Sequence, residues 1–184
     1  MLIDEELPVF DFTEHHLIRI AASPAHVDRT LRTADLASSL IMRALFFLRG
    51  LPRFIRHGRI GKAGRLDLAE LQRCGFMMLR DEPEHEMVLG VVGRFWHPTG
   101  NLATIEPEEF RGFEQDGFCK AAWNFVIKPD GGSSLLSTET RIRCFGPHAR
   151  KRFSAYWFFV RPFSGLIRIL MLRKIKRAAE GAVP

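Results

Sequence analysis

The chain has 184 residues and a formal net charge of +6; 46% of its residues are hydrophobic and 26% are charged. A chain of this length and composition folds as about one globular domain with a sizeable core, which excludes a disordered protein. The basic balance permits acidic partners, but no nucleic-acid reader motif is present, so we expect no nucleic-acid partner. We predict a single domain over residues 1–184, with residues 1–12 as an acidic lead-in.

The first predicted elements are a strand and two short helices. Residues 15–21 largely alternate between polar and apolar side chains, which predicts a strand. Ser23 followed by Pro24 is an N-cap with proline at the first helical position, and apolar residues continue from there at helical spacing. A second amphipathic helix is expected between residues 38 and 50. Both helices precede the rest of the sheet.

Residues 53–65 form the least regular part of the chain, rich in glycine and basic side chains. The basic side chains are Arg53, Arg56, Arg59 and Lys62. One interpretation is a solvated basic loop. The other is peripheral contact with an anionic membrane, to which each basic residue near the surface contributes about 1 kcal/mol.

From residue 76 onward, the hydrophobic pattern changes to a period of two. It predicts strands over residues 76–80, 87–96, 118–128 and 135–145, and residues 130–132 form the last hairpin turn. In the final hairpin, apolar side chains occupy one face and charged side chains the other. We therefore expect one face of the sheet to be interior and the other to meet water.

The last long segment, residues 148–179, has apolar residues at three- and four-residue steps, which predicts one long amphipathic helix. Pro162 lies inside it and should kink it, because proline lacks the backbone donor and clashes with the preceding turn. The basic residues near its end suit the negative end of the helix dipole or an anionic surface. These residues are Arg168, Arg173, Lys174, Lys176 and Arg177. Since arginines interrupt its apolar run, we expect no membrane span.

The elements together predict an α+β protein, in which a curved antiparallel sheet wraps around a long kinked C-terminal helix. The N-terminus lacks the basic start and apolar core of a secretory signal. The three cysteines, Cys74, Cys119 and Cys144, are odd in number and far apart in sequence. We therefore expect reduced, structural thiols in a cytoplasmic protein.

Several residues carry a resemblance to a known family. They are Ile18, Ile20, Ala22, Ser23, Pro24, Val27 and Leu31 at the first strand–helix junction, and Arg152, Phe153, Tyr156 and Trp157 in the last helix. With the closing hairpin, they resemble the START-like, Bet v 1-like superfamily, also called polyketide cyclase/dehydrase and lipid-transport (SRPBCC) proteins. The resemblance covers Phe12 to Glu180. It implies a helix-grip fold and an apolar cavity for lipids, polyketides, sterols or quinones, but no particular activity.

The candidate ligand-binding residues lie on the inner faces of these elements. If Phe95 points inward from its strand, then so does His97, which would place an imidazole at the cavity rim for hydrogen bonding or proton transfer. Thr138 and Thr140 offer inward hydroxyls, although β-propensity also explains them. The aromatic candidates, which suit a core as well as a ligand wall, are Trp123, Phe125, Phe153 and Trp157.

Two functions stay open. The first is a module that binds a small or medium apolar ligand between the sheet and the long helix. The second is a cyclase-like or aromatase-like enzyme in which a group such as His97 moves protons. The histidines lack metal-ligand spacing and no nucleophile elbow is present, so we expect no metal and no cofactor.

Overall fold

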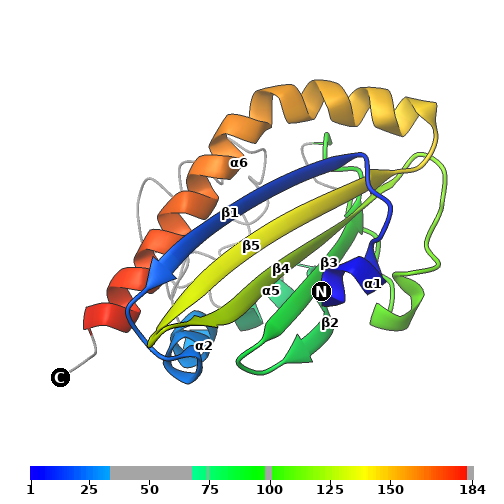
Figure 1. Ribbon diagram of the computed structural model, residues 1–184. Coiled ribbons are helices and arrows are strands. Elements are labelled where there is room, and N and C mark those ends of the chain that lie inside the picture. Colours follow the sequence, from blue (N-terminus) through cyan, green and yellow to red (C-terminus); the bar gives the residue numbers. More distant parts are fainter. Residues whose placement is uncertain (34–67, 74, 98–100, 182–184) are drawn as a thin grey trace.

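The structure is a computed structural model that describes residues 1–33, 68–73, 75–97 and 101–181. Five antiparallel strands form one sheet in the order β1-β5-β4-β3-β2, and a long helix, α6, lies across one of its faces (Figure 1). The elements are α1 (Leu2–Glu6), β1 (Phe12–Ile20), α2 (Pro24–Thr33), α5 (Leu68–Arg73), β2 (Met77–Glu82), β3 (Glu86–Gly93), the 3-10 helix η1 (Pro107–Glu109), β4 (Cys119–Asp130), β5 (Ser133–Cys144) and α6 (Pro147–Gly181). The predicted α+β class is confirmed.

The first strand and helix form as their sequence predicts. In β1, every second side chain up to Ile18 is half-buried between exposed neighbours, as expected for an edge strand with one covered face. Ser23 caps α2, since its Oγ accepts the backbone N–H of His26 at 3.4 Å. The helix predicted between residues 38 and 50 and the basic segment 53–65 lie outside the described residues.

Helix α6 is the longest element described and packs mainly against β1, and also against α2 and β5. Its inner residues Ile167, Met171 and Ile175 are buried together with Leu89 and Leu136 of the sheet. Pro162 lies within the helix, and Figure 1 shows α6 bending along its length, so the predicted kinked helix is present.

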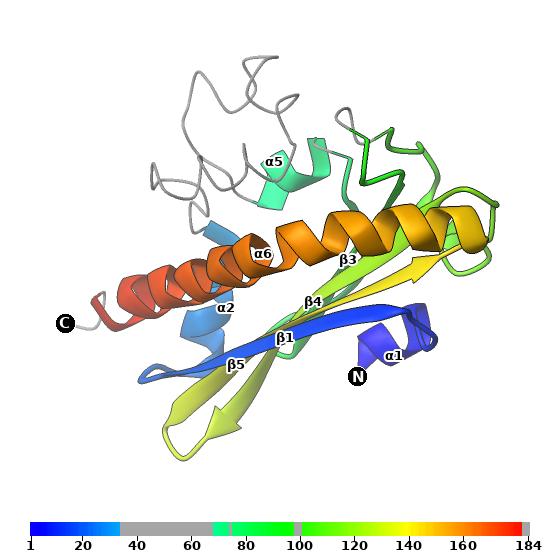
Figure 2. The same ribbon diagram turned by 90° about the horizontal axis from the view of Figure 1, so that it is seen from above.

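By length and composition alone, α6 is apolar enough to cross a membrane, a criterion that the core helix of a soluble protein also meets. However, 44% of its most apolar window is buried within the fold. The helix described here lies across the sheet (Figure 2).

The opposite face of the sheet is covered over β3 and much of β4 and meets water along β1, which corrects in part the expectation that the whole face meets water. Helix α1 and the segment around η1 pack on this face, which we call the α1 face, and bury a second apolar cluster there. The cluster consists of Leu2, Ile3, Leu7, Val88, Val92, Phe110 and Ala122. All eight residues of β3 are consequently buried. The charged side chains Lys120 and Arg141 are buried on this face.

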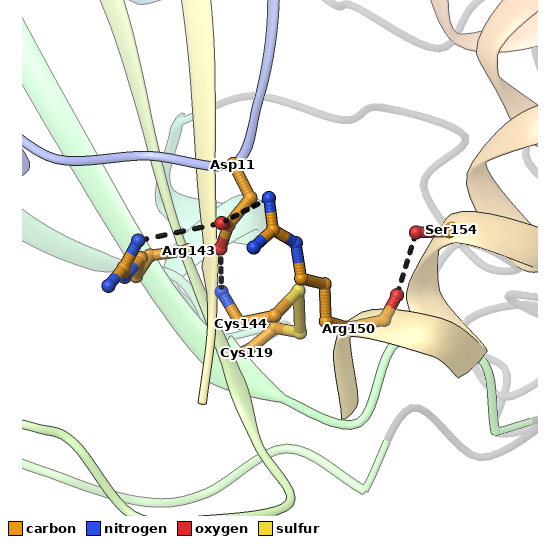
Figure 3. Close-up of a disulfide and its surroundings, with 6 residues drawn as sticks. All are labelled: Asp11, Cys119, Arg143, Cys144, Arg150 and Ser154. Atoms are coloured by element: carbon orange, nitrogen blue, oxygen red, sulfur yellow. Dashed lines mark hydrogen bonds and ion pairs between the residues drawn. A yellow bond between two sulfur atoms is a disulfide. The ribbon is translucent and has the colours of Figure 1, made fainter. Parts of the chain in front are cut away.

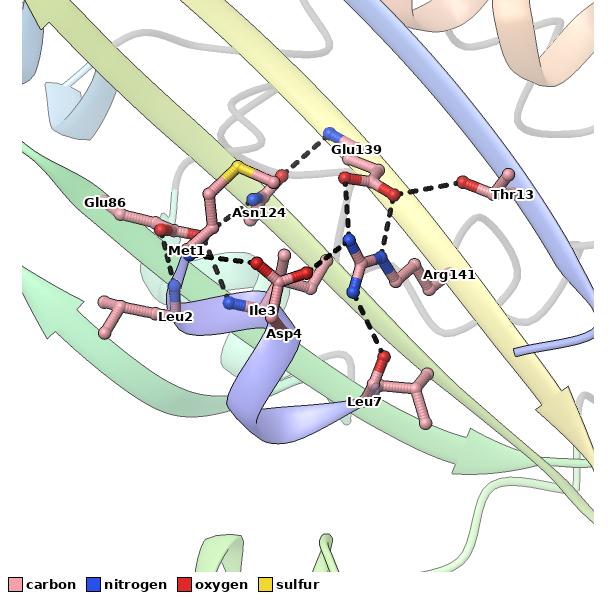
Figure 4. Close-up of polar contacts among 10 residues, drawn as sticks. All are labelled: Met1, Leu2, Ile3, Asp4, Leu7, Thr13, Glu86, Asn124, Glu139 and Arg141. Carbon is pink, nitrogen blue, oxygen red and sulfur yellow. Dashed lines mark hydrogen bonds and ion pairs between the residues drawn. The ribbon is translucent and has the colours of Figure 1, made fainter. Parts of the chain in front are cut away.

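The buried charges of Lys120 and Arg141 have different kinds of partner. The Nζ of Lys120 donates to the carbonyl oxygens of Phe110 and Arg111 at 3.0 and 2.8 Å. Burial lowers the pKa of Lys120, because the charged ammonium loses its hydration. Arg141 pairs with Asp4 and Glu139, each at 2.7 Å (Figure 4).

Glu86 holds α1 against the sheet. Its carboxylate, in a residue only 2% exposed, accepts the backbone N–H groups of Leu2 at 2.7 Å and Ile3 at 3.2 Å. It also accepts the side-chain amide of Asn124 at 2.7 Å (Figure 4). The first N–H groups of a helix have no partner within the helix, so the buried carboxylate and the start of α1 satisfy each other.

Two of the three cysteines form a disulfide, so the expectation of reduced thiols is wrong for them. Cys119 and Cys144 are directly opposite each other across β4 and β5, with their Cα atoms 4.2 Å apart (Figure 3). They are distant in sequence, but the hairpin register brings them together. Cys74 lies outside the described residues, and the cytoplasmic location stays a prediction.

Replacing Cys119 and Cys144 together by serine should lower the free energy of unfolding by about 3 kcal/mol, because the bond closes a loop of 25 residues in the unfolded chain. Urea unfolding of the parent with and without reductant checks this. Replacing Cys74 by serine provides the control and should leave the reductant effect unchanged. Equal stability of the oxidised and reduced parent would contradict the prediction.

Candidate functional site

A group of buried and half-buried polar side chains lies between the sheet and α6, in an interface that is otherwise largely apolar. Strand β1 supplies Glu14 and His16, β5 supplies Thr140, and α6 supplies Ser164 and Arg168. We call these five residues the α6 polar cluster. Alternation places Glu14 and His16 on the same face, and the strand register sets Glu14 opposite Thr140. Ser164 and Arg168 are four residues apart and therefore share one side of the helix.

Arg168 is the centre of the cluster and is only 4% exposed. Its Nη1 donates to the Oγ of Ser164 at 2.8 Å, and its Nη2 donates to the Oγ1 of Thr140. Its guanidinium carbon lies 5.5 Å from the ring centre of Trp123. A carboxylate oxygen of Glu14 is 3.9 Å from Nη1, at the limit of an ion pair. Neutral hydroxyls and an aromatic face thus supply much of the environment of this buried cation.

Glu14 and His16 form a pair beside the arginine. The Nε2 of His16 lies 3.2 Å from the Oε1 of Glu14. The other oxygen, Oε2, is buried and has no hydrogen-bond partner among the described residues. Gly165 makes this approach possible, because a Cβ at that position would lie 2.6 Å from the Oε1 of Glu14.

Three of the predicted ligand-binding residues meet at this cluster. They are Thr140, Trp123 and Thr138. Trp123 donates its indole N–H to the Oγ1 of Thr138 at 2.7 Å, and Thr138 donates to the carbonyl oxygen of Asn124 at 2.7 Å. Phe125, a fourth, packs on Trp123 with ring centres 4.9 Å apart. Trp123 is half-buried, whereas Phe125, Thr138 and Thr140 are buried.

The remaining aromatic candidates form a separate group near the start of α6. Phe153 and Trp157 stack with ring centres 5.7 Å apart, and Phe95 meets Phe153 edge-on at 6.1 Å. Phe12 of β1 completes the group, at 5.0 Å from Phe153. Through this aromatic group, the N-terminal half of α6 packs against the sheet.

His97 is placed apart from both groups. Strand β3 ends at Gly93, and His97 is exposed in a turn where its backbone N–H donates to the carbonyl of Arg94 at 2.8 Å. The alternation that would bring His97 inward with Phe95 therefore does not extend this far. The imidazole that the structure places beside the interior polar groups is that of His16.

Sequence reasoning missed Glu14, His16 and Arg168. In the sequence, Arg168 is grouped with the basic residues at the end of the helix, but Arg168 follows Ser164 by four residues and precedes Met171 by three. That spacing puts it on the buried side, where Ser164 and Met171 also lie. A charged residue in phase with the apolar stripe is the signal that could have identified the site.

The cluster has two chemical capabilities. A guanidinium in a dry interior binds a carboxylate, phosphate or carbonyl oxygen strongly, because water competes little there. A histidine beside a carboxylate can accept and release a proton. In the described part of the chain, no group of three or more His, Cys, Asp or Glu residues could hold a metal ion.

An open pocket of about 580 Å³ lies along α2, away from the cluster. It is lined by His26, Arg29, Thr30, Arg32 and Thr33. A cavity between the sheet and α6 stays a prediction.

An antiparallel sheet with one long C-terminal helix across it, and polar groups between them, defines an α+β protein compatible with a helix-grip fold. No protein-family model and no curated protein matches the chain. Among solved structures, the chain is similar to TTHA0849 from Thermus thermophilus, with a TM-score of 0.38 and 10% identity over 94% of this chain and 100% of that one.

Proposed function

We propose that the protein binds a small or medium apolar ligand, such as a lipid, polyketide or quinone, between the sheet and α6. Its polar end, a carboxylate or carbonyl oxygen, meets Arg168. The observation that carries this proposal is a buried arginine whose Nη1 and Nη2 donate to the neutral hydroxyls of Ser164 and Thr140. Burying a guanidinium costs free energy that a methionine would not cost, so its presence at this depth favours a binding role.

The surroundings of Arg168 suit an apolar tail. Several apolar side chains next to the main core are only half-buried, so a ligand would remove further apolar surface from water there. They are Ile18, Phe76, Met78, Trp123, Phe163 and Leu170. Trp123 touches both regions, because its ring faces Arg168 and also meets Phe76 at 6.1 Å.

A second candidate is a cyclase-like enzyme in which the cluster moves a proton on a bound ligand. The contact of 3.2 Å between His16 and Glu14 favours it, since a carboxylate orients an imidazole for proton transfer. Arg168 would then stabilise negative charge on a ligand oxygen near this pair. His16 takes the role first assigned to His97.

Native mass spectrometry of the purified protein tests the binding function. We expect adducts of long-chain carboxylic acids on the parent and loss of at least about tenfold in affinity for Arg168→Met, the size of one charge-assisted hydrogen bond. Arg173→Met, at an exposed site on the same helix, is the matched control and should bind normally. Equal binding by the parent and Arg168→Met would overturn the proposed role of Arg168.

A β-keto ester with an apolar tail, used in deuterated water, separates the two functions, because the C–H bonds between its two carbonyl groups are acidic whereas those beside a carboxylate are not. An enzyme exchanges protons next to the ligand carbonyl faster than buffer does, and His16→Gln stops that exchange while the ligand stays bound. If the ligand protons exchange with the parent protein no faster than in buffer alone, the enzyme proposal is contradicted and binding is the function that stands.

A further inference from the structure

The outer side of α6 carries an apolar stripe that nothing in the described structure covers. Phe158 is 76% exposed, Phe159 is 70% exposed and Leu166 is 42% exposed. Ala155 and Pro162 between them are exposed as well. Spacings of three, four and seven residues place these side chains along one side of the helix, opposite the residues that pack on the sheet. We call these five residues the α6 outer stripe.

Basic residues bracket the α6 outer stripe at both ends. Lys151 and Arg152 lie before it and Arg173 and Arg177 after it, all exposed. None of these four side chains forms an ion pair with a described carboxylate. The helix contains no acidic residue before Glu180. The outer side of α6 therefore combines large apolar side chains with positive charge along about seven turns, from Lys151 to Arg177.

We propose that the α6 outer stripe and its basic ends form a docking surface for an anionic lipid bilayer. Exposed phenylalanines between cationic side chains suit the boundary between headgroups and acyl chains, where rings enter the apolar layer and cations meet phosphates. The charge pattern favours this occupant, because a helix face whose charges are all positive complements a uniformly negative surface.

The geometry makes the attachment peripheral. The inner side of α6 is fixed to the sheet, and Arg168 and Ser164 are buried there. Only the outer side can enter the lipid, so α6 lies in the plane of the interface. The proposal is independent of the ligand proposed above, since it uses the other side of the helix.

Vesicle co-sedimentation of the full chain tests the docking surface. We expect binding to phosphatidylcholine vesicles that contain about one third phosphatidylglycerol, weaker binding to pure phosphatidylcholine, and release by high salt. Phe158→Ser with Phe159→Ser should weaken binding at least about tenfold at every salt concentration. Arg173→Gln with Arg177→Gln should weaken it at low salt and flatten the salt dependence.

Matched controls lie on the other side of the molecule. Leu17→Ser removes a side chain that is 57% exposed on β1, and Lys128→Gln with Arg19→Gln removes the same charge as the double arginine variant. Both should bind vesicles like the parent. Phe158→Trp, a conservative change, should show a shift of emission to shorter wavelength on anionic vesicles only.

Three results would overturn the proposal. One is equal binding to neutral and anionic vesicles at all salt concentrations. Another is loss of thermal stability in Phe158→Ser with Phe159→Ser while vesicle binding is unchanged, which would mean that the stripe is covered by this chain. The third is a concentration-dependent dimer that the same variant abolishes, with no vesicle binding by the parent.

Discussion

Replacing Arg168 by methionine is expected to lower the free energy of unfolding by about 3 to 5 kcal/mol, whereas replacing Arg168 and Glu14 together should cost less than about 1 kcal/mol. The single change leaves the Glu14 carboxylate buried without its cation at 3.9 Å. It also leaves the hydroxyls of Ser164 and Thr140 without their donor. The double change, Glu14→Leu with Arg168→Met, removes both charges and fills the same space with apolar atoms.

Urea unfolding of the parent, both single variants and the double variant measures the coupling between the two side chains as a double-mutant cycle. Thr33→Ala, remote from the cluster on exposed α2 surface, provides a baseline for a neutral change. Additive effects of the two changes would show that the charges do not interact. If the double variant is as stable as the parent yet binds no ligand, the buried charges serve binding and not folding.

Replacing Glu86 by alanine is expected to lower the free energy of unfolding by about 3 kcal/mol. The carboxylate accepts N–H groups from Leu2, Ile3 and Asn124, and alanine leaves all three without their acceptor. The loss of unfolding free energy is limited, because α1 can detach from the sheet and its N–H groups can then bond to water. Glu86→Gln should lose about half as much, since the amide keeps one acceptor oxygen.

Hydrogen exchange distinguishes this mechanism from a general loss of stability. In Glu86→Ala, the amides of α1 and of the neighbouring α1 face should exchange faster, while those of α6 near Arg168 stay protected. Uniform acceleration across the chain would contradict the assignment of Glu86 to α1. An unchanged free energy of unfolding would show that the buried Glu86 carboxylate makes no net contribution to stability.

The sequence allowed the architecture to be predicted because its periodicities are long. The alternation over residues 15–21, most of which lie in β1, and the helical spacing over residues 148–179, within α6, leave little ambiguity between strand and helix. Helix α1 escaped prediction because it has only five residues, too few for a periodic signal. Without α1, nothing in the pattern indicated that Lys120 and Arg141 would be buried.

The candidate site was predictable only in part, because it depends on which strands are neighbours. Alternation identified Thr138 and Thr140 as inward hydroxyls, but the pairing of β1 with β5 decides that Glu14 and His16 lie beside them. The pairing of Cys119 with Cys144 depends on register in the same way. His97 was misplaced because alternation was extended past the end of β3.

Helix α6 is attached at both ends to β1 or to the residues that flank it, and these attachments bear on how a ligand could pass between the helix and the sheet. Near its start, Arg150 pairs with Asp11 at 3.3 Å (Figure 3), and near its end Glu180 accepts the backbone N–H of Ala21 at 2.8 Å. Lys176 adds a second tether by donating to the carbonyl of Arg19 at 2.7 Å. Helix α6 is held at both ends, and Pro162 removes a backbone hydrogen bond near its middle. The helix should therefore bend most easily near Pro162. If the protein binds a ligand as proposed, we expect the ligand to reach Arg168 through local bending of α6 while the attachments at both ends stay formed.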